Sequence, residues 1–206
     1  MEIVYDFLEG RCDYPVFIKQ LYRDKSIFKW LQSLYREEML EDSTFRCENA
    51  LWRANGNVKA CIDDLKAFYI GVYVKNDIYN FLYYYLTYAL PERPIQRIGH
   101  YERLAHLYTN AVPDCFGGPE VDGLISDIIE AVPEGLTKTQ TVKYIKDKLK
   151  ELFPWKKRPF WIEMPEWPVS NGKPMEYISK KSDGDLFLYL FRNPETGEER
   201  IIKQFA

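Results

Sequence analysis

Histidine is scarce in this sequence, and its two copies are poorly spaced for a metal or catalytic site. His100 and His106 fall in one predicted helix, where a separation of six residues turns the second side chain about 120° away from the first. No cysteine stands at a metal-ligand spacing from either histidine. The sequence therefore predicts no metal site and no cofactor.

Paired cysteines and glycine-rich phosphate loops are also missing. The four cysteines, Cys12, Cys47, Cys61 and Cys115, form no C-x-x-C pair, which is typical of reduced, mostly buried thiols in a cytoplasmic protein. Neither G-x-x-x-x-G-K-[ST] nor G-x-G-x-x-G occurs. We therefore expect no catalytic residue and no enzymatic activity. The alternative is an enzyme whose site is built around Cys115 or His100.

The chain lacks an excess of positive charge and a long apolar run. Its net charge is −3, whereas a general nucleic-acid binder needs a basic surface. None of its apolar runs approaches the roughly 20 residues that cross a bilayer. The first ten residues, MEIVYDFLEG, have no basic segment followed by an apolar stretch, as a signal peptide would. We expect a cytoplasmic protein that binds neither nucleic acid nor membrane.

A short basic run, Lys156-Lys157-Arg158, interrupts this acidic chain. Because Trp155 precedes it and further aromatic residues follow, it resembles a small nucleic-acid or phosphate contact. Three charges are few, however, and two glutamates come soon after. The competing interpretation is a solvated connector.

The most apolar and aromatic stretch runs from Ile62 to Leu90. From Asp77 onward its apolar residues follow a helical period, and the predicted core face includes Phe81 and Tyr85. Pro91 ends this helix. The first part, through Lys75, is interpreted as a second buried helix, although the apolar run at 67–74 also fits a buried strand.

Helical patterns continue up to residue 152, including a helix from Pro94 through Thr109 and a last helix capped by Thr139. From Phe153 onward the composition changes to a proline- and tryptophan-rich segment, here called the connector. Three strand-like runs separated by turn residues follow it. The runs are Met175–Lys180, Leu186–Arg192 and Arg200–Phe205. The sequence thus predicts an α+β protein: a helical domain at 1–152, and a domain at 153–206 whose three-stranded antiparallel meander docks on the helices.

Two groups of residues are candidates for contact with a partner. Tyr84 and Tyr88 lie on the polar face of the 77–90 helix, where they either pack against a second helix or form a partner surface. An acidic group follows the helix capped by Ser26, and it is either a solvated helix end or a patch for a cationic partner. The acidic residues are Glu37, Glu38, Glu41 and Asp42.

The C-terminal quarter resembles a class of bacterial proteins. Its segments PEWP at 165–168, NGKPM at 171–175 and NPETGEERIIKQF at 193–205 are similar to the C-terminal part of small cytosolic immunity proteins from polymorphic-toxin or contact-dependent-inhibition loci. The resemblance implies a protein that masks a toxin's active site, and it assigns no functional residue. An acidic inhibitor would be steered toward a basic toxin. The alternative is a phage or host adaptor or regulatory protein.

Overall fold

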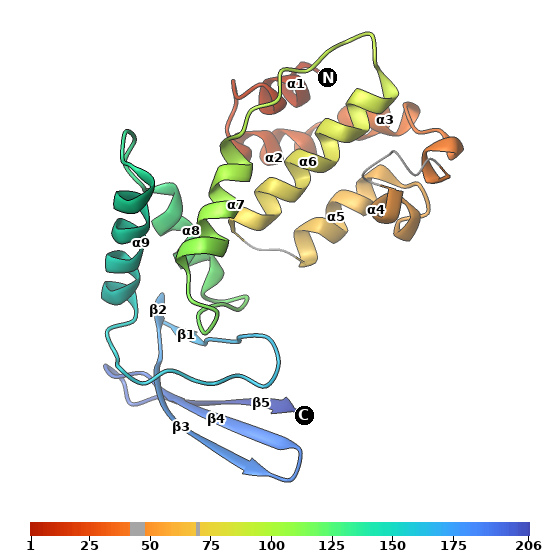
Figure 1. The fold of residues 1–206 in the computed structure, drawn as a ribbon. Coiled ribbons are helices and arrows are strands. Elements are labelled where there is room, and N and C mark those ends of the chain that lie inside the picture. The colour runs from red at the N-terminus through yellow and green to blue at the C-terminus, as the bar shows by residue number, and fades with distance from the viewer. Residues whose placement is uncertain (42–47, 69–70) are drawn as a thin grey trace. The chain divides into compact units, whose positions relative to one another are not determined.

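The protein is an α+β molecule in which helices precede a small antiparallel sheet (Figure 1). The computed structural model describes residues 1–41, 48–68 and 71–206. It divides into two compact units, Met1–Ala105 and His106–Ala206. The predicted division at residue 152 follows the change of secondary structure, whereas the boundary between the compact units falls in the sequence of α7 (His100–Ala111). Among the described residues, no helix has the length and apolar character needed to cross a membrane.

The first unit is helical and is organised around α6. Its elements in chain order are α1 (Glu2–Leu8), α2 (Tyr14–Arg23), α3 (Lys25–Ser33), the 3₁₀ helix η1 (Glu37–Leu40), α4 (Glu48–Arg53), α5 (Val58–Phe68), α6 (Val72–Ala89) and the start of α7. Helix α6 packs against α1 and α5 (Figure 1).

The predicted core face of α6 is confirmed. Phe81 is 2% exposed and Tyr85 is 0% exposed, and the two rings stack with centroids 5.6 Å apart. The Tyr85 hydroxyl donates to the Leu31 carbonyl at 2.8 Å. Tyr79 does the same for the Leu8 carbonyl at 3.1 Å. Each phenol therefore buries its ring without leaving its hydroxyl unpaired.

Helix α6 begins earlier than the sequence predicts. It starts at Val72 instead of Asp77, because Gly71 just before it adopts φ 65°, a left-handed conformation that interrupts a helix and that glycine adopts without strain. The strand alternative for this region is wrong in the described residues, since 62–68 and 72–75 are helical. Asp77 thus lies inside the helix, where burial raises the pKa of its carboxyl.

Helix α7 begins later than predicted, at His100 instead of Pro94. The backbone N–H of Ile98 donates to the Tyr79 hydroxyl at 2.8 Å, so the tertiary contact holds this segment in an irregular conformation. Arg97 reaches back to Asn80 on α6 at 3.1 Å. Local helix signals at Pro94 are overridden by these contacts with α6.

Two predicted caps are each displaced by two residues. The N-cap of α3 is Asp24, whose carboxylate accepts from the backbone N–H of Ser26 at 2.9 Å. The N-cap of α9 is Thr137, which forms a capping box with Gln140. In both cases an oxygen-bearing side chain further upstream satisfies the free N–H groups of the first turn.

The second unit contains the end of α7, two further helices and two antiparallel sheets. Its elements are α8 (Asp122–Glu130), α9 (Lys138–Leu152), β1 (Val169–Ser170), β2 (Lys173–Pro174), β3 (Glu176–Asp183), β4 (Leu186–Arg192) and β5 (Glu199–Phe205). Strands β3, β4 and β5 form the predicted meander in that order. The β1–β2 hairpin was not predicted, although Asn171-Gly172, with φ 53° and 72°, is the strongest two-residue hairpin signal.

A cluster of aromatic rings joins the connector to the inner face of the meander. Trp167 is 1% exposed and its ring centroid lies 4.9 Å from Phe153, 5.4 Å from Phe116 and 5.6 Å from Phe191. Its indole N–H donates to the Met175 carbonyl at 2.8 Å. The connector therefore supplies the cover that a three-stranded sheet needs on one face.

Gln204 on β5 attaches the middle of the connector to the sheet. Its side chain is fully buried, and Oε1 accepts from the backbone N–H groups of Ile162 and Glu163 at 3.0 and 3.1 Å. Its Nε2 donates to the Met164 carbonyl at 2.7 Å. One side chain thus satisfies three backbone groups of the connector.

Gly118 is required where the loop before α8 meets the connector. Its φ is 116°, and a Cβ atom there would lie 2.9 Å from Glu166 Cα and from the Pro165 carbonyl oxygen. We expect Gly118→Ala to lower the free energy of unfolding by about 2–3 kcal/mol, because a left-handed backbone is combined with overlap against another backbone. Urea denaturation of the purified variant measures this loss.

Gly123 in α8 provides the matched control. A Cβ atom there would have no neighbour within 4 Å, and alanine favours helix, so Gly123→Ala should leave stability unchanged or raise it by about 0.5 kcal/mol. Equal effects of the two substitutions would contradict the steric argument for Gly118.

Candidate functional site

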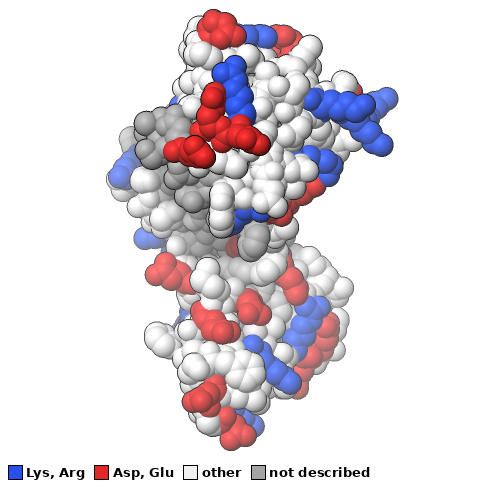
Figure 2. Space-filling view, turned by 90° about the vertical axis from the view of Figure 1, so that its right-hand side faces the viewer, with Lys and Arg blue, Asp and Glu red and all other residues white. Residues whose placement is uncertain are grey.

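The predicted acidic group lies on η1 and not at the end of a helix. Helix α3 ends at Ser33, and Glu37 and Glu38 form the first turn of the separate element η1. At that end of a helix, carboxylates interact favourably with the positive end of the helix dipole. Both are exposed, as is Glu41, and Asp42 lies outside the described residues. Arg36 stands 3.6 Å from the Glu38 carboxylate. Figure 2 accordingly shows acidic side chains mixed with basic ones on this side of the first unit.

Tyr84 and Tyr88 are half-buried on α6. The Arg97 guanidinium lies 5.5 Å from the centre of the Tyr84 ring and donates to its hydroxyl at 3.3 Å. Part of the Tyr84 surface is therefore occupied by a residue of the same unit. The tyrosines and the acidic group are on different elements, α6 and η1, and their role in binding stays a prediction.

The two alternative catalytic residues, His100 and Cys115, belong to different compact units. His100 is exposed on α7. Cys115 is half-buried, and burial raises the pKa of its thiol although the Arg158 charge acts in the opposite direction. A thiol with a raised pKa forms less thiolate at neutral pH and is a poorer nucleophile.

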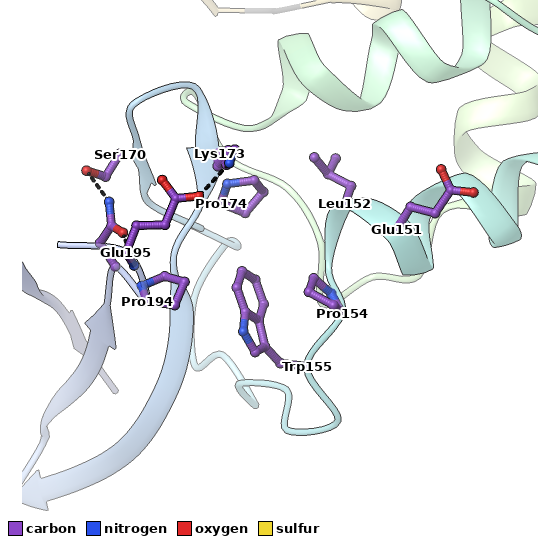
Figure 3. A pocket seen from close by; sticks show the side chains of 10 residues that line it. Glu151, Leu152, Pro154, Trp155, Ser170, Lys173, Pro174, Pro194 and Glu195 are labelled. Carbon is purple, nitrogen blue, oxygen red and sulfur yellow. Dashed lines mark hydrogen bonds and ion pairs between the residues drawn. The ribbon is translucent and has the colours of Figure 1, made fainter. Parts of the chain in front are cut away.

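The second unit contains a cavity of about 400 Å³, here called the Trp155 pocket (Figure 3). Its walls come from three segments far apart in sequence: the end of α9 and the start of the connector, the β1–β2 hairpin, and the β4–β5 turn. Figure 3 shows Trp155 standing between Pro154 on one side and Pro194 on the other. The remaining lining residues are Glu151, Leu152, Ser170, Lys173, Pro174, Asn193 and Glu195.

Most polar side chains of the Trp155 pocket already have hydrogen-bond or ion-pair partners in the protein. Asn193 Nδ2 donates to Ser170 Oγ at 2.9 Å, and Ser170 Oγ donates to the Glu198 carboxylate at 2.7 Å. Lys173 forms an ion pair of 2.5 Å with Glu195. The cavity therefore presents mainly the indole of Trp155 and proline rings to an occupant, and such a surface suits an apolar group.

A second cavity of about 320 Å³, here called the Arg158 pocket, lies beside α9 in the same unit. Its lining combines an apolar surface with three cationic side chains and a thiol. The apolar residues are Pro113, Phe116 and Leu149, the cationic ones Lys146, Lys150 and Arg158, and the thiol is Cys115. Trp161 fixes this loop by donating its indole N–H to the Cys115 carbonyl at 3.0 Å.

The outer face of the meander carries apolar side chains in the register of the strands. Across the three strands, one row is Ser179–Leu190–Ile201, the next Lys181–Leu188–Lys203, and the third Asp183–Leu186–Phe205. Ile201 is 55% exposed and Phe205 is 60% exposed. We call these nine residues the outer sheet face.

Sequence reasoning did not find the two pockets, because each is assembled from separate segments. Two residues singled out in the sequence do line the second pocket: Arg158, from the basic run at 156–158, and the candidate thiol Cys115. No group of three His, Cys, Asp or Glu residues suited to a metal ion occurs within the described ranges. Comparison with protein-family models, with curated proteins and with solved structures finds no match for this chain.

Proposed function

We propose that this protein acts by binding another protein, and that the bound protein is a toxin that it neutralises. The first part is supported by the outer sheet face. The second part rests on the resemblance of the C-terminal quarter to bacterial immunity proteins. Each part has its own experimental test.

Strand β4 is apolar on both of its faces. Its sequence is LFLYLFR, and strands with continuous apolar runs are typical of sheets that are covered on both sides. The connector covers the inner side, where Trp161 lies 4.8 Å from Tyr189 and 5.8 Å from Phe191. The leucines of the outer side are half-buried, and their cross-strand neighbours Ile201 and Phe205 are exposed.

The charges on this face indicate the chemistry of the partner. Lys181 and Lys203 flank Leu188 in one cross-strand row, and neither has a carboxylate within ion-pair distance in the described part of the chain. The face carries one carboxylate, Asp183, so its lysines outnumber its acids by one. An apolar surface with two lysines outside any ion pair fits a protein partner that presents apolar side chains beside carboxylates. The Trp155 pocket adds a preformed cavity that can receive one apolar side chain of that partner.

The exposed acidic group on η1 has a different role in this proposal. Glu37, Glu38 and Glu41 would attract a basic region of the toxin and raise the association rate, so any gain in affinity from them comes through association and not through slower dissociation. The dissociation rate therefore tests the outer sheet face, and the association rate tests the acidic group.

The test is co-expression with the product of the neighbouring gene, followed by binding measurements on the purified pair. We expect the double variant Ile201→Thr, Phe205→Ser to weaken binding by about 100-fold, because two contacts worth roughly 1–2 kcal/mol each are removed. Threonine keeps the strand preference at 201. Val16→Thr removes an equally exposed apolar surface on α2 and should leave the affinity unchanged.

The other outcomes separate the two parts of the proposal. Reversal of Glu37 and Glu38 to Lys should slow association and weaken its salt dependence, with little change in the dissociation rate. Absence of binding to the neighbouring gene product would exclude the toxin assignment. A dimer of this chain that the double variant converts to monomer would show that a second copy covers the outer sheet face, and would overturn the proposal of a different protein partner.

A further inference from the structure

The Arg158 pocket concentrates positive charge in a protein whose net charge is −3. Three of its seven lining residues are cationic and none is a carboxylate. Lys146 and Lys150 lie one turn apart on the same face of α9. Lys150 is paired with Asp147 at 2.9 Å, whereas Lys146 and Arg158 have no carboxylate within ion-pair distance in the described ranges.

Arg158 is held in place by uncharged groups. Its Nη2 donates to the Phe153 carbonyl at 3.0 Å and its Nη1 to the carbonyls of Lys157, at 3.0 Å, and Trp155. The guanidinium carbon also lies 4.9 Å from the centre of the Phe116 ring. The charge is therefore fixed at the C-terminal end of α9, where it compensates the negative end of the helix dipole.

These contacts leave part of the guanidinium available. A guanidinium has five N–H groups, and three of them are used by the carbonyls. The remaining two are on Nε and Nη2, an edge on which arginine binds a carboxylate through two hydrogen bonds. Burial lowers the pKa of Arg158, so an anion beside it would stabilise a charge that is now poorly solvated.

We propose that the Arg158 pocket binds a small organic acid that has one carboxylate and one apolar group. The carboxylate would lie between Arg158 and Lys146, and the apolar group would lie on Phe116 and Leu149. A cavity of about 320 Å³ is at the small end of the range for ligand sites, which fits one ring or a short chain. This site is separate from the protein-binding surface proposed above.

Cys115 provides a reporter inside the pocket. Its thiol is half-buried, and its alkylation at alkaline pH can be followed for that residue alone by peptide mass spectrometry. Cys12 is also free and half-buried but lies outside the pocket. A ligand in the pocket should slow alkylation of Cys115 and leave the rate at Cys12 unchanged.

The experiment uses benzoate as the probe, with benzamide as its neutral counterpart and inorganic phosphate as an anion without an apolar group. We expect benzoate to protect Cys115 in a saturable manner, with the other two at least about fivefold weaker because each lacks one of the two required interactions. Equal protection by benzamide, stronger protection by phosphate, or no protection by benzoate would each overturn the proposal.

Two matched lysine variants test whether Lys146 binds the carboxylate of the probe. Lys146→Gln should weaken benzoate binding at least about fivefold, since it removes one charge-assisted contact. Lys143→Gln alters another exposed lysine of α9 that does not line the pocket, and it should have no effect. Identical affinities for the two variants would overturn the placement of the carboxylate, and because both positions are exposed, folding is not at risk in either.

Discussion

Replacing Trp167 with alanine is expected to lower the free energy of unfolding by about 3–5 kcal/mol. The side chain is 1% exposed, and its removal would leave a cavity among Phe116, Phe153 and Phe191. It would also leave the Met175 carbonyl without its donor. Because domains of this size are stable by only about 5–15 kcal/mol in total, this loss threatens the fold of the second unit.

Two comparisons make the Trp167 prediction specific. Phe160, in the same connector, is 79% exposed, so Phe160→Ala should change stability by less than about 0.5 kcal/mol. Trp167→Phe keeps an aromatic ring but loses the hydrogen bond to Met175, and we expect an intermediate cost of about 1–3 kcal/mol. Urea denaturation gives the totals, and hydrogen exchange should locate the loss in residues 106–206. Unchanged exchange there in Trp167→Ala would contradict the prediction.

The second large effect is expected in α6. Phe81→Ala should cost about 3–5 kcal/mol, because the ring is 2% exposed and stacks on Tyr85. Increased hydrogen exchange should appear in residues 1–105, which distinguishes this variant from Trp167→Ala.

The control for Phe81 is Thr87→Ala on the same helix. Thr87 is exposed, and alanine favours helix, so stability should be unchanged or slightly higher. A Phe81→Ala protein with the urea midpoint of the unmodified chain would show that the stacked pair contributes little to the first unit.

The parts of the fold that the sequence predicts are those determined by local periodicity and turn chemistry. The apolar stripe through Phe81 and Tyr85 has a helical period, and the meander is bounded by turn residues. The start of α7 could not be predicted, because Pro94 is a good helix signal and the competing contact from Tyr79 to Ile98 joins residues far apart in sequence. Gly71 is present in the sequence, but a single glycine does not show whether a helix is interrupted there or continues through it.

The candidate sites were less predictable than the fold for the same reason. Trp155, Ser170 and Asn193 share a pocket although they come from three segments, and no spacing in the sequence connects them. The acidic group was recognisable as exposed, but its position on η1 depends on where α3 ends. The outer sheet face also follows from a local pattern, since the continuous apolar run of β4 can be read directly from residues 186–191.

The attachment of the connector by Gln204 has a consequence for the order of events during synthesis. The backbone N–H groups of Ile162 and Glu163 have no hydrogen-bond acceptor from Gln204 until that residue is synthesised, 42 and 41 residues later. At about 5–20 residues per second, this delay is roughly 2–8 s. During that interval Trp161 and its apolar neighbours have no sheet to cover, so the nascent connector is exposed to chaperones and proteases.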